Sequence, residues 1–316
     1  MTRKYIVSSA QMGPIARAET RQSCVRRMTD MMQEAAARGS RFVVFPELAL
    51  TSFFPRWMID DPDELDMWFE TSMPNIDTAP LFEMAKTHHI GFSLGYAEKT
   101  VENGKTRYFN TAILVNQNGE ICGKYRKVHL PGYHEPQPNR DHQHLEKRYF
   151  EQGNLGFPVT PMLDTRIGML ICNDRRWPEG WRVLALQAAE LVCLGYNTPD
   201  DHSGFADVDA LADFHHILSM QSGSYQNSVW SIATAKCGAE EGSSLIGNSV
   251  ITAPSGQVVA QSNTLEDEVI HAEIDLDMAQ QYRQTFFDFA RHRAPECYRL
   301  ITERKGAEPE PDDTLG

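Results

Sequence analysis

Short apolar runs of strand length alternate with helical patterns along almost the whole chain of 316 residues. Residues 42–45, Phe-Val-Val-Phe, form one such run, which stops at Pro46-Glu47 as expected of a strand buried on both faces. A helix is predicted over residues 19–38, where apolar side chains recur at helical spacing before Gly39. This alternation favours a single mixed α/β domain with sheets inside and helices outside.

The other predicted elements repeat this order along the chain. Strands are predicted at residues 4–10, 90–97, 111–115, 121–125, 166–172, 191–194, 230–234, 248–253, 257–261 and 269–274. Helices are predicted near residues 178–189 and 209–226. The strand–turn–strand unit that begins at Asn110 is similar to a second one that begins at Asn248, with one residue of difference in the turn. This faint repeat suggests a pseudo-symmetric fold with two stacked sheets.

The bulk composition argues against several classes of protein. The formal net charge of −13 and the pI of about 5.3 oppose binding to nucleic acid. No apolar run approaches the roughly 20 residues that cross a membrane, and the N-terminus lacks the features of a signal peptide. Six scattered cysteines do not form a disulfide framework and fit a reducing cytoplasm. We therefore expect a cytoplasmic enzyme with an acidic, Pro-containing mobile tail over residues 304–316.

Three extended runs each end near a residue that can react or carry charge, namely Glu47, Lys127 and Cys172. Each residue has a plain structural explanation, since Glu47 could cap the next segment and Lys127 could be a solvated surface residue. Cys172 could likewise be a small core residue. Their joint occurrence favours a catalytic site in which a thiolate is the nucleophile.

Two arginines, Arg175 and Arg176, follow Cys172 closely. Positive charge beside a thiol lowers its pKa, and a guanidinium group grips a carboxylate in a planar fork. The alternative for such a pair is a surface salt bridge of little consequence. Their position next to the reactive thiol favours recognition of a substrate carboxylate.

Several segments resemble the nitrilase superfamily of carbon–nitrogen hydrolases. Its three signatures are matched by Phe-Pro-Glu at 45–47, Lys-Tyr-Arg-Lys-Val-His-Leu-Pro at 124–131 and Cys-Asn-Asp-Arg-Arg-Trp-Pro-Glu at 172–179. The segments at 14–20, 46–57, 144–150, 195–199 and 214–227 look like one branch, the N-carbamoyl-D-amino acid amidohydrolases. The resemblance covers residues 1–303 as one hydrolase domain. It implies a four-layer αββα sandwich, in which two mixed sheets are flanked by helices.

The resemblance implies a Glu–Lys–Cys triad, which falls on Glu47, Lys127 and Cys172. Glu47 would then be the general base, and Lys127 would stabilise the oxyanion. Cys172 would hold a covalent carbamoyl intermediate. Glu146 matches a further catalytic glutamate that helps position the substrate and the proton transfers.

The same resemblance implies a set of substrate contacts around the thiol. His129 and His144 would orient the lysine and the glutamate beside the substrate. The other expected contacts are Asn173, Arg175, Arg176, Asn197 and Thr198. Residues 133–141 and 200–209 depart from the branch pattern, so the breadth of the side-chain pocket is left open.

Two rival functions stay open at this point. Another carboxylate-recognising amidase, such as a β-ureidopropionase-like enzyme, would share the triad but prefer a longer spacer. A metal-dependent amidohydrolase could use histidines such as His142 and His144, although no complementary carboxylate pattern stands out. A catalytically inactive protein on the same fold is disfavoured by the intact Glu47, Lys127 and Cys172.

The expected partners follow from the same reasoning. We expect a small-molecule N-carbamoyl amino acid as substrate, no nucleic acid, no membrane and neither a metal nor an organic cofactor. The D configuration of the substrate rests on the resemblance alone. The resemblance also implies a homodimer or homotetramer, in which sheet-flanking helices are buried between copies.

Overall fold

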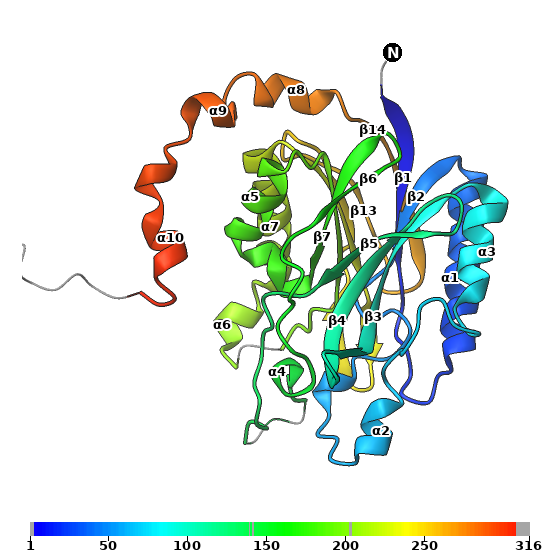
Figure 1. Cartoon of the computed structure of the whole chain (residues 1–316). Coiled ribbons are helices and arrows are strands. Elements are labelled where there is room, and N and C mark those ends of the chain that lie inside the picture. Colours follow the sequence, from blue (N-terminus) through cyan, green and yellow to red (C-terminus); the bar gives the residue numbers. More distant parts are fainter. Residues whose placement is uncertain (1–2, 139, 141, 202–203, 308–316) are drawn as a thin grey trace, which may run out of the picture.

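The computed structural model describes residues 3–138, 140, 142–201 and 204–307 of the chain. Its core consists of two six-stranded sheets that face each other, with a layer of helices on each outer side (Figure 1). This arrangement confirms the expected αββα sandwich of two mixed sheets. No helix among the described residues is both long and apolar enough to cross a membrane.

The first sheet has the strand order β14-β1-β2-β3-β4-β5, and helices α1 and α3 cover its outer face (Figure 1). Strands β1, β2 and β3 are parallel, because a helix connects each of them to the next. The bounds are β1 Lys4–Gln11, α1 Arg21–Ala37, β2 Ser40–Val44, α3 Ala79–His88, β3 Gly91–Glu102, β4 Lys105–Val115, β5 Ile121–Arg126 and β14 Glu268–Asp275.

The second sheet has the order β13-β12-β9-β8-β7-β6 and is covered by helices α5 and α7. Here β7, β8 and β9 are the parallel strands. The bounds are β6 Val159–Met162, β7 Thr165–Ile171, α5 Pro178–Leu186, β8 Leu191–Tyr196, α7 Ala212–Asn227, β9 Trp230–Ala235, β12 Val250–Thr252 and β13 Val258–Gln261.

Smaller elements connect these layers and form the C-terminal arm. They are η1 Phe54–Arg56, α2 Pro62–Asp66, α4 Glu146–Tyr149, η2 Cys172–Arg176, α6 Ala206–Asp209, β10 Cys237–Glu240, β11 Ser243–Ile246, α8 Met278–Arg283, α9 Phe289–His292, η3 Pro295–Cys297 and α10 Arg299–Glu303. The arm from α8 to α10 leaves the sandwich on the side of α5 and α7 (Figure 1).

The two sheets are built on the same plan. Each has three parallel strands, an antiparallel edge strand on one side and an antiparallel hairpin on the other. The hairpins are β4–β5 and β12–β13, which are the two units that resemble each other in sequence. The predicted pseudo-symmetry is therefore confirmed at the level of topology.

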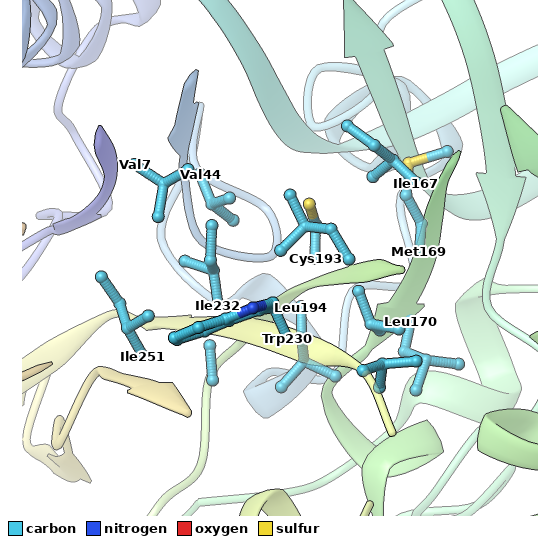
Figure 2. Packing of buried hydrophobic residues seen from close by; sticks show 14 of the residues in the cluster. Val7, Val44, Ile167, Met169, Leu170, Cys193, Leu194, Trp230, Ile232 and Ile251 are labelled. Atoms are coloured by element: carbon cyan, nitrogen blue, oxygen red, sulfur yellow. The ribbon is translucent and has the colours of Figure 1, made fainter. Parts of the chain in front are cut away.

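The space between the sheets is filled by apolar side chains from both of them (Figure 2). Val7 and Val44 come from the first sheet, whereas Met169, Cys193 and Ile232 come from the second. A strand presents alternate residues to its two faces, so one strand can serve this core and a helix at once. Because side chains of both sheets interdigitate here, the strand ends are held in fixed relative positions.

The structure corrects several predicted boundaries. The strands expected at 90–97 and 111–115 are longer, because β3 and β4 continue to a tight turn at Asn103-Gly104, where both residues have positive φ. Helix α3 and strands β6, β10 and β11 were not predicted. The helix expected near 209–226 is α7, which begins at Ala212 after the separate short helix α6. Residues 308–316 of the predicted tail lie outside the described residues.

Candidate active site

The three predicted triad residues follow strands that end on the same side of the sandwich. Glu47 follows β2, Lys127 follows β5, and Cys172 follows β7 of the other sheet. A salt bridge of 2.7 Å joins Lys127 Nζ to Glu47 Oε1. The two sheets thus contribute to one buried site, as the sequence motifs predict.

Two glycines let both sheets approach the backbone of Glu47 closely. A Cβ atom on Gly95 of β3 would lie 2.6 Å from the Pro46 carbonyl oxygen. A Cβ atom on Gly195 of β8 would lie 2.4 Å from the Glu47 nitrogen. Side chains at these positions would displace the Pro46-Glu47 segment, so both glycines fix where the carboxylate lies.

Lys127 is enclosed by two carboxylates. Its Nζ atom lies 2.7 Å from Glu47 Oε1 and 2.6 Å from Glu146 Oε2, and all three side chains are buried. Burial alone would lower the pKa of Lys127, but Glu146 and Glu47 outweigh it and raise that pKa above its usual value. Lys127 is therefore a permanent cation, suited to stabilising negative charge.

Glu146 is held as a carboxylate by its neighbours. Burial alone would raise the pKa of Glu146, but the Lys127 charge and a bond to His144 lower it overall. His144 Nε2 lies 3.1 Å from Glu146 Oε1. The His144 ring also packs edge-on against Phe53, with a centroid distance of 5.6 Å. This histidine thus holds Glu146 in place.

Cys172 is the first residue of the 3-10 turn η2, whereas the sequence placed it as the last residue of a strand. Its φ angle of 48° lies in the left-handed region, which is uncommon for a residue with a side chain. The reversal points the thiol away from β7 toward the Asn197 carbonyl oxygen, 3.6 Å from Sγ. A backbone outlier at this position is typical of a functional site.

Charges around Cys172 act on the thiol in opposite directions. Burial and the negative charge of Glu47 raise the pKa of Cys172, while Lys127 and Arg175 offset part of that increase. The net effect raises this pKa above its usual value, which favours the thiol over the thiolate. The predicted lowering by arginine is thus only one contribution, and a base is needed to form the thiolate.

A cleft of about 380 Å³ opens over Cys172. Its other lining residues are Pro131, Gly132, Tyr133, His144, Lys147, Asn173, Arg176, Asn197, Thr198 and Pro199. The cleft therefore brings together His144, Asn173, Arg176, Asn197 and Thr198 of the predicted contacts. Tyr133 belongs to the segment 133–141, which was expected to border the pocket.

The two arginines have different surroundings. Arg175 is buried, donates to the Cys172 carbonyl oxygen at 2.8 Å and to Thr198 Oγ1 at 2.9 Å, and lies over the Tyr196 ring. Arg176 lines the cleft, and its one hydrogen bond within the described residues goes to Asn173 Oδ1 at 3.4 Å. Of the two arginines expected to clamp a substrate carboxylate, Arg176 thus lines the cleft, whereas Arg175 lies behind Cys172.

No carboxylate among the described residues pairs with Arg176. The like charge of Arg175, together with burial, lowers the pKa of Arg176 to about 10. A guanidinium group still carries its charge at neutral pH with such a pKa. A cation in a cleft that no acidic side chain of the described residues lines is suited to binding an anion.

Asp174 fastens the segments that carry Lys127 and Cys172 to one another, and sequence reasoning missed it. Its buried carboxylate accepts hydrogen bonds from the Ile171 backbone, from Tyr125 Oη and from the backbone and ring of His129. His129 in turn stacks on Trp177. The signal available in the sequence was an Asp in the tight turn just after an apolar strand.

Asn110 was also missed as a neighbour of the triad. Its Nδ2 atom donates to Glu47 Oε1 at 2.7 Å. Asn197 Nδ2 donates to the Glu47 carbonyl oxygen at 3.1 Å. The sequence comparison of the two hairpins singled out Asn110 only as part of a repeat, which gave no sign of a role in the site.

Two of the histidines that a metal-dependent mechanism could use have carboxylate partners. His129 pairs with Asp174, and His144 pairs with Glu146. Across the described ranges, no three His, Cys, Asp or Glu side chains are grouped as ligands for a metal ion. The arrangement that is present joins a thiol, a carboxylate and an ammonium group, which together can attack a carbonyl carbon.

Comparison with known proteins gives a consistent result. A profile described as carbon–nitrogen hydrolase matches residues 6–284. The N-carbamoylputrescine amidase of Arabidopsis thaliana is 28% identical over 321 residues, covering 96% of this chain and 97% of that enzyme. A nitrilase of Pyrococcus abyssi is 29% identical, covering 85% of this chain and 90% of its own length.

Solved structures share the fold at lower sequence identity. A carbon–nitrogen hydrolase from Helicobacter pylori G27 superposes with a TM-score of 0.80 at 22% identity, over 96% of this chain and 99% of its own. An amidase from Nesterenkonia sp. superposes with a TM-score of 0.70 at 19% identity, over 94% and 96% of the two chains.

Proposed function

The chain belongs to the carbon–nitrogen hydrolase family, and from that premise we propose that it hydrolyses N-carbamoyl-D-amino acids to the D-amino acid, ammonia and carbon dioxide. The observation that carries the choice of substrate is Arg176, whose guanidinium group lies in the same cleft as Cys172 and pairs with no carboxylate of the described residues. A ureido group at the thiol would leave an α-carboxylate free to pair with Arg176.

The first half of the reaction forms a covalent intermediate. Glu47 takes the proton from the Cys172 thiol, and the sulfur attacks the ureido carbonyl carbon. Negative charge develops on the carbonyl oxygen, where Lys127 and a backbone N–H after the nucleophile stabilise it. The bond to the terminal nitrogen then breaks, and that nitrogen leaves as ammonia with the proton from Glu47.

The second half releases the amino acid. Glu47 takes a proton from water, and the resulting hydroxide attacks the carbamoyl carbon as the bond to sulfur breaks and the thiol regains a proton. The product is a carbamate, which loses carbon dioxide to give the free amino acid. Glu146 contributes by keeping Lys127 in place and by positioning the water and the substrate.

One relative is named for a substrate of the opposite charge. The Arabidopsis enzyme is named for N-carbamoylputrescine, whose far end is an amine. Such a cation would be repelled by Arg176 and Lys147, which both line the cleft. A substrate with a carboxylate fits these charges better. In an N-carbamoyl α-amino acid one carbon separates the carboxylate from the ureido nitrogen, whereas in β-ureidopropionate two carbons separate them.

The proposal is tested by assaying ammonia release from a panel of N-carbamoyl-D- and L-amino acids, with N-carbamoyl-β-alanine and N-carbamoylputrescine. We expect the D compounds to give the highest kcat/KM. Preference for N-carbamoylputrescine or for N-carbamoyl-β-alanine would refute it.

Arg176→Gln should raise KM for the carbamoyl amino acids about 10- to 100-fold and change turnover of a neutral amide little. Arg166→Gln, at an exposed position of β7, serves as the control.

A further inference from the structure

Asn110 lies in the middle of β4, where it is 1% exposed and directly contacts Glu47. Its backbone oxygen accepts a hydrogen bond of 2.9 Å from the Lys127 nitrogen. The same residue therefore holds the backbone of one triad member and the side chain of another. We propose that Asn110 is a positioning residue, which determines which oxygen of Glu47 takes the proton from Cys172.

The orientation of the Asn110 amide is fixed by its surroundings. An ionised carboxylate only accepts hydrogen bonds, so the amide must present its nitrogen to Glu47 Oε1. Its oxygen, Oδ1, is buried and has no partner among the described residues. Rotating the amide would bring two acceptor oxygens together, and the present orientation is therefore the favourable one.

The donors around Glu47 leave only one oxygen with spare capacity. Oε1 accepts from both Lys127 Nζ and Asn110 Nδ2, each at 2.7 Å. Of the described residues, the Asn197 backbone nitrogen is the one donor to Oε2, at 3.0 Å. A carboxylate oxygen has about two acceptor positions, so Oε1 is saturated and Oε2 is not. The thiol hydrogen of Cys172 is therefore transferred to Oε2, where the new O–H bond forms while the S–H electrons stay on sulfur.

Removing the Asn110 donor frees Oε1 and weakens the hold on the ionised carboxylate. As a result, the Cys172–Glu47 pair holds the first proton that it releases more tightly. We expect Asn110→Leu to lower kcat about 10- to 100-fold with a much smaller change in KM. The acid limb of the pH–rate profile should move to higher pH by about one unit, since a hydrogen bond to a charged group is lost.

Asn110→Asp provides a second variant of nearly the same shape. A protonated Asp can donate to Oε1 as the amide does, whereas an ionised Asp repels Glu47. The loss of activity in Asn110→Asp should therefore grow as the pH rises, while the loss in Asn110→Leu should grow as the pH falls. Opposite pH trends at one position are not produced by a general disturbance of packing.

The matched control is Asn248→Gly, at the corresponding position of the other hairpin. The Asn248 side chain contacts Asp213 and Gln261 and lies outside the triad, and its φ of 66° suits glycine. The pH–rate profile of Asn248→Gly should equal that of the unaltered protein. The proposal is overturned if Asn110→Leu leaves both kcat and the pH of the acid limb unchanged. If that variant does not fold, a loss in Asn110→Asp that is independent of pH overturns it.

The inference rests on the proposed thiol mechanism, so its test also includes a measurement without substrate. The rate at which iodoacetamide alkylates Cys172 should show the same shifts of the acid limb as the pH–rate profile. If no carbamoyl amino acid is hydrolysed, the substrate proposal fails, yet the alkylation profiles still support or overturn the role of Asn110.

Discussion

Among the buried cysteines, Cys172 differs from Cys193 in the charges around it. Burial raises the pKa of Cys24, Cys193 and Cys237, and in Cys193 it is the only cause. At Cys172 the cations Lys127 and Arg175 favour the thiolate as well. A thiol with a raised pKa and with cations beside it becomes a nucleophile when a base removes its proton.

Cys172→Ala should therefore abolish turnover, by more than about a thousandfold, while the fold is kept. Cys193→Ala, in the buried strand β8, is the control and should lose stability but keep activity, because it removes only a packed side chain. Mass spectrometry of acid-quenched reactions should show a covalent adduct in Cys193→Ala and none in Cys172→Ala. Substantial activity in Cys172→Ala would contradict the thiol mechanism.

At the scale of elements, the site depends on how closely strands β3 and β8 approach the segment after β2. Gly95 and Gly195 belong to different sheets, and each leaves room for the Pro46-Glu47 backbone. The position of the Glu47 carboxylate is therefore set by packing between the two sheets, in addition to its own hydrogen bonds.

Gly195→Ala should displace Glu47 and reduce kcat by about a hundredfold, since a shift of about 1 Å in a reacting group has that effect. The Cβ of the new residue would lie 2.4 Å from the Glu47 nitrogen, so the segment must move. Gly13→Ala is the control, because its Cβ would meet no atom closer than 3.4 Å. Steady-state kinetics measure both variants, and equal kcat values in them would refute this role of Gly195.

Hydrophobic periodicity was sufficient to predict most of the elements that build the layers, because buried strands and amphipathic helices have distinct patterns. It failed for the outer half of the β3–β4 hairpin. There the strands carry charged and polar residues such as Glu98, Lys99 and Arg107, so no apolar run marks them. The Asn103-Gly104 dipeptide was the remaining signal for that hairpin.

The candidate site was predicted residue by residue, but not the relation between the two arginines. Arg175 and Arg176 are adjacent on a 3-10 turn, where successive side chains point about 120° apart. Which of them faces the cleft depends on the orientation of the turn relative to the sheet, which cannot be read from the sequence pattern. The roles of Asp174 and Asn110 likewise arise from contacts between separate strands.

The whole molecule is acidic, and paired carboxylates link its stability to pH. Burial alone would raise the pKa of Glu98, but bonds from Arg126 and Lys124 lower it overall. A carboxyl group whose pKa is lower in the folded state stabilises the fold above its unfolded pKa of about 4.3. That stabilisation is lost as the pH falls through the folded value.

Glu98→Gln should therefore lower the free energy of unfolding at pH 7 and make it less dependent on pH between about 5 and 3. Glu273→Gln is the control, because the Glu273 side chain is 65% exposed and its Lys4 contact is 4.0 Å long. Urea titrations followed by tryptophan fluorescence measure the free energy at each pH. If the free energy of unfolding fell equally with decreasing pH in the unaltered protein and in Glu98→Gln, this linkage would be contradicted.

The two outer helical layers differ in the character of their exposed faces. Helix α7 exposes Phe214, Leu218 and Tyr225, whose spacing of four and seven residues places them on one stripe. The neighbouring helix α5 exposes Val183 and Leu186. Helices α1 and α3 on the opposite side expose no large hydrophobic residue, as all of their residues are described. We propose that a second copy of the chain covers the α5–α7 face, because an exposed apolar stripe of this kind marks an association surface.

Sedimentation or light scattering should give at least twice the chain mass of 35.8 kDa for the unaltered protein, in line with the expected homodimer or homotetramer. Leu218→Glu places a charge in the centre of the α7 stripe, where its desolvation opposes pairing, so the observed mass should fall toward that of one chain. Ile76→Glu is the control, since Ile76 is 92% exposed and shortly precedes α3, which lies on the opposite side of the sandwich from α5 and α7. It should leave the mass unchanged. If Leu218→Glu assembles like the unaltered protein, copies pair through another face and the α5–α7 stripe needs a different explanation.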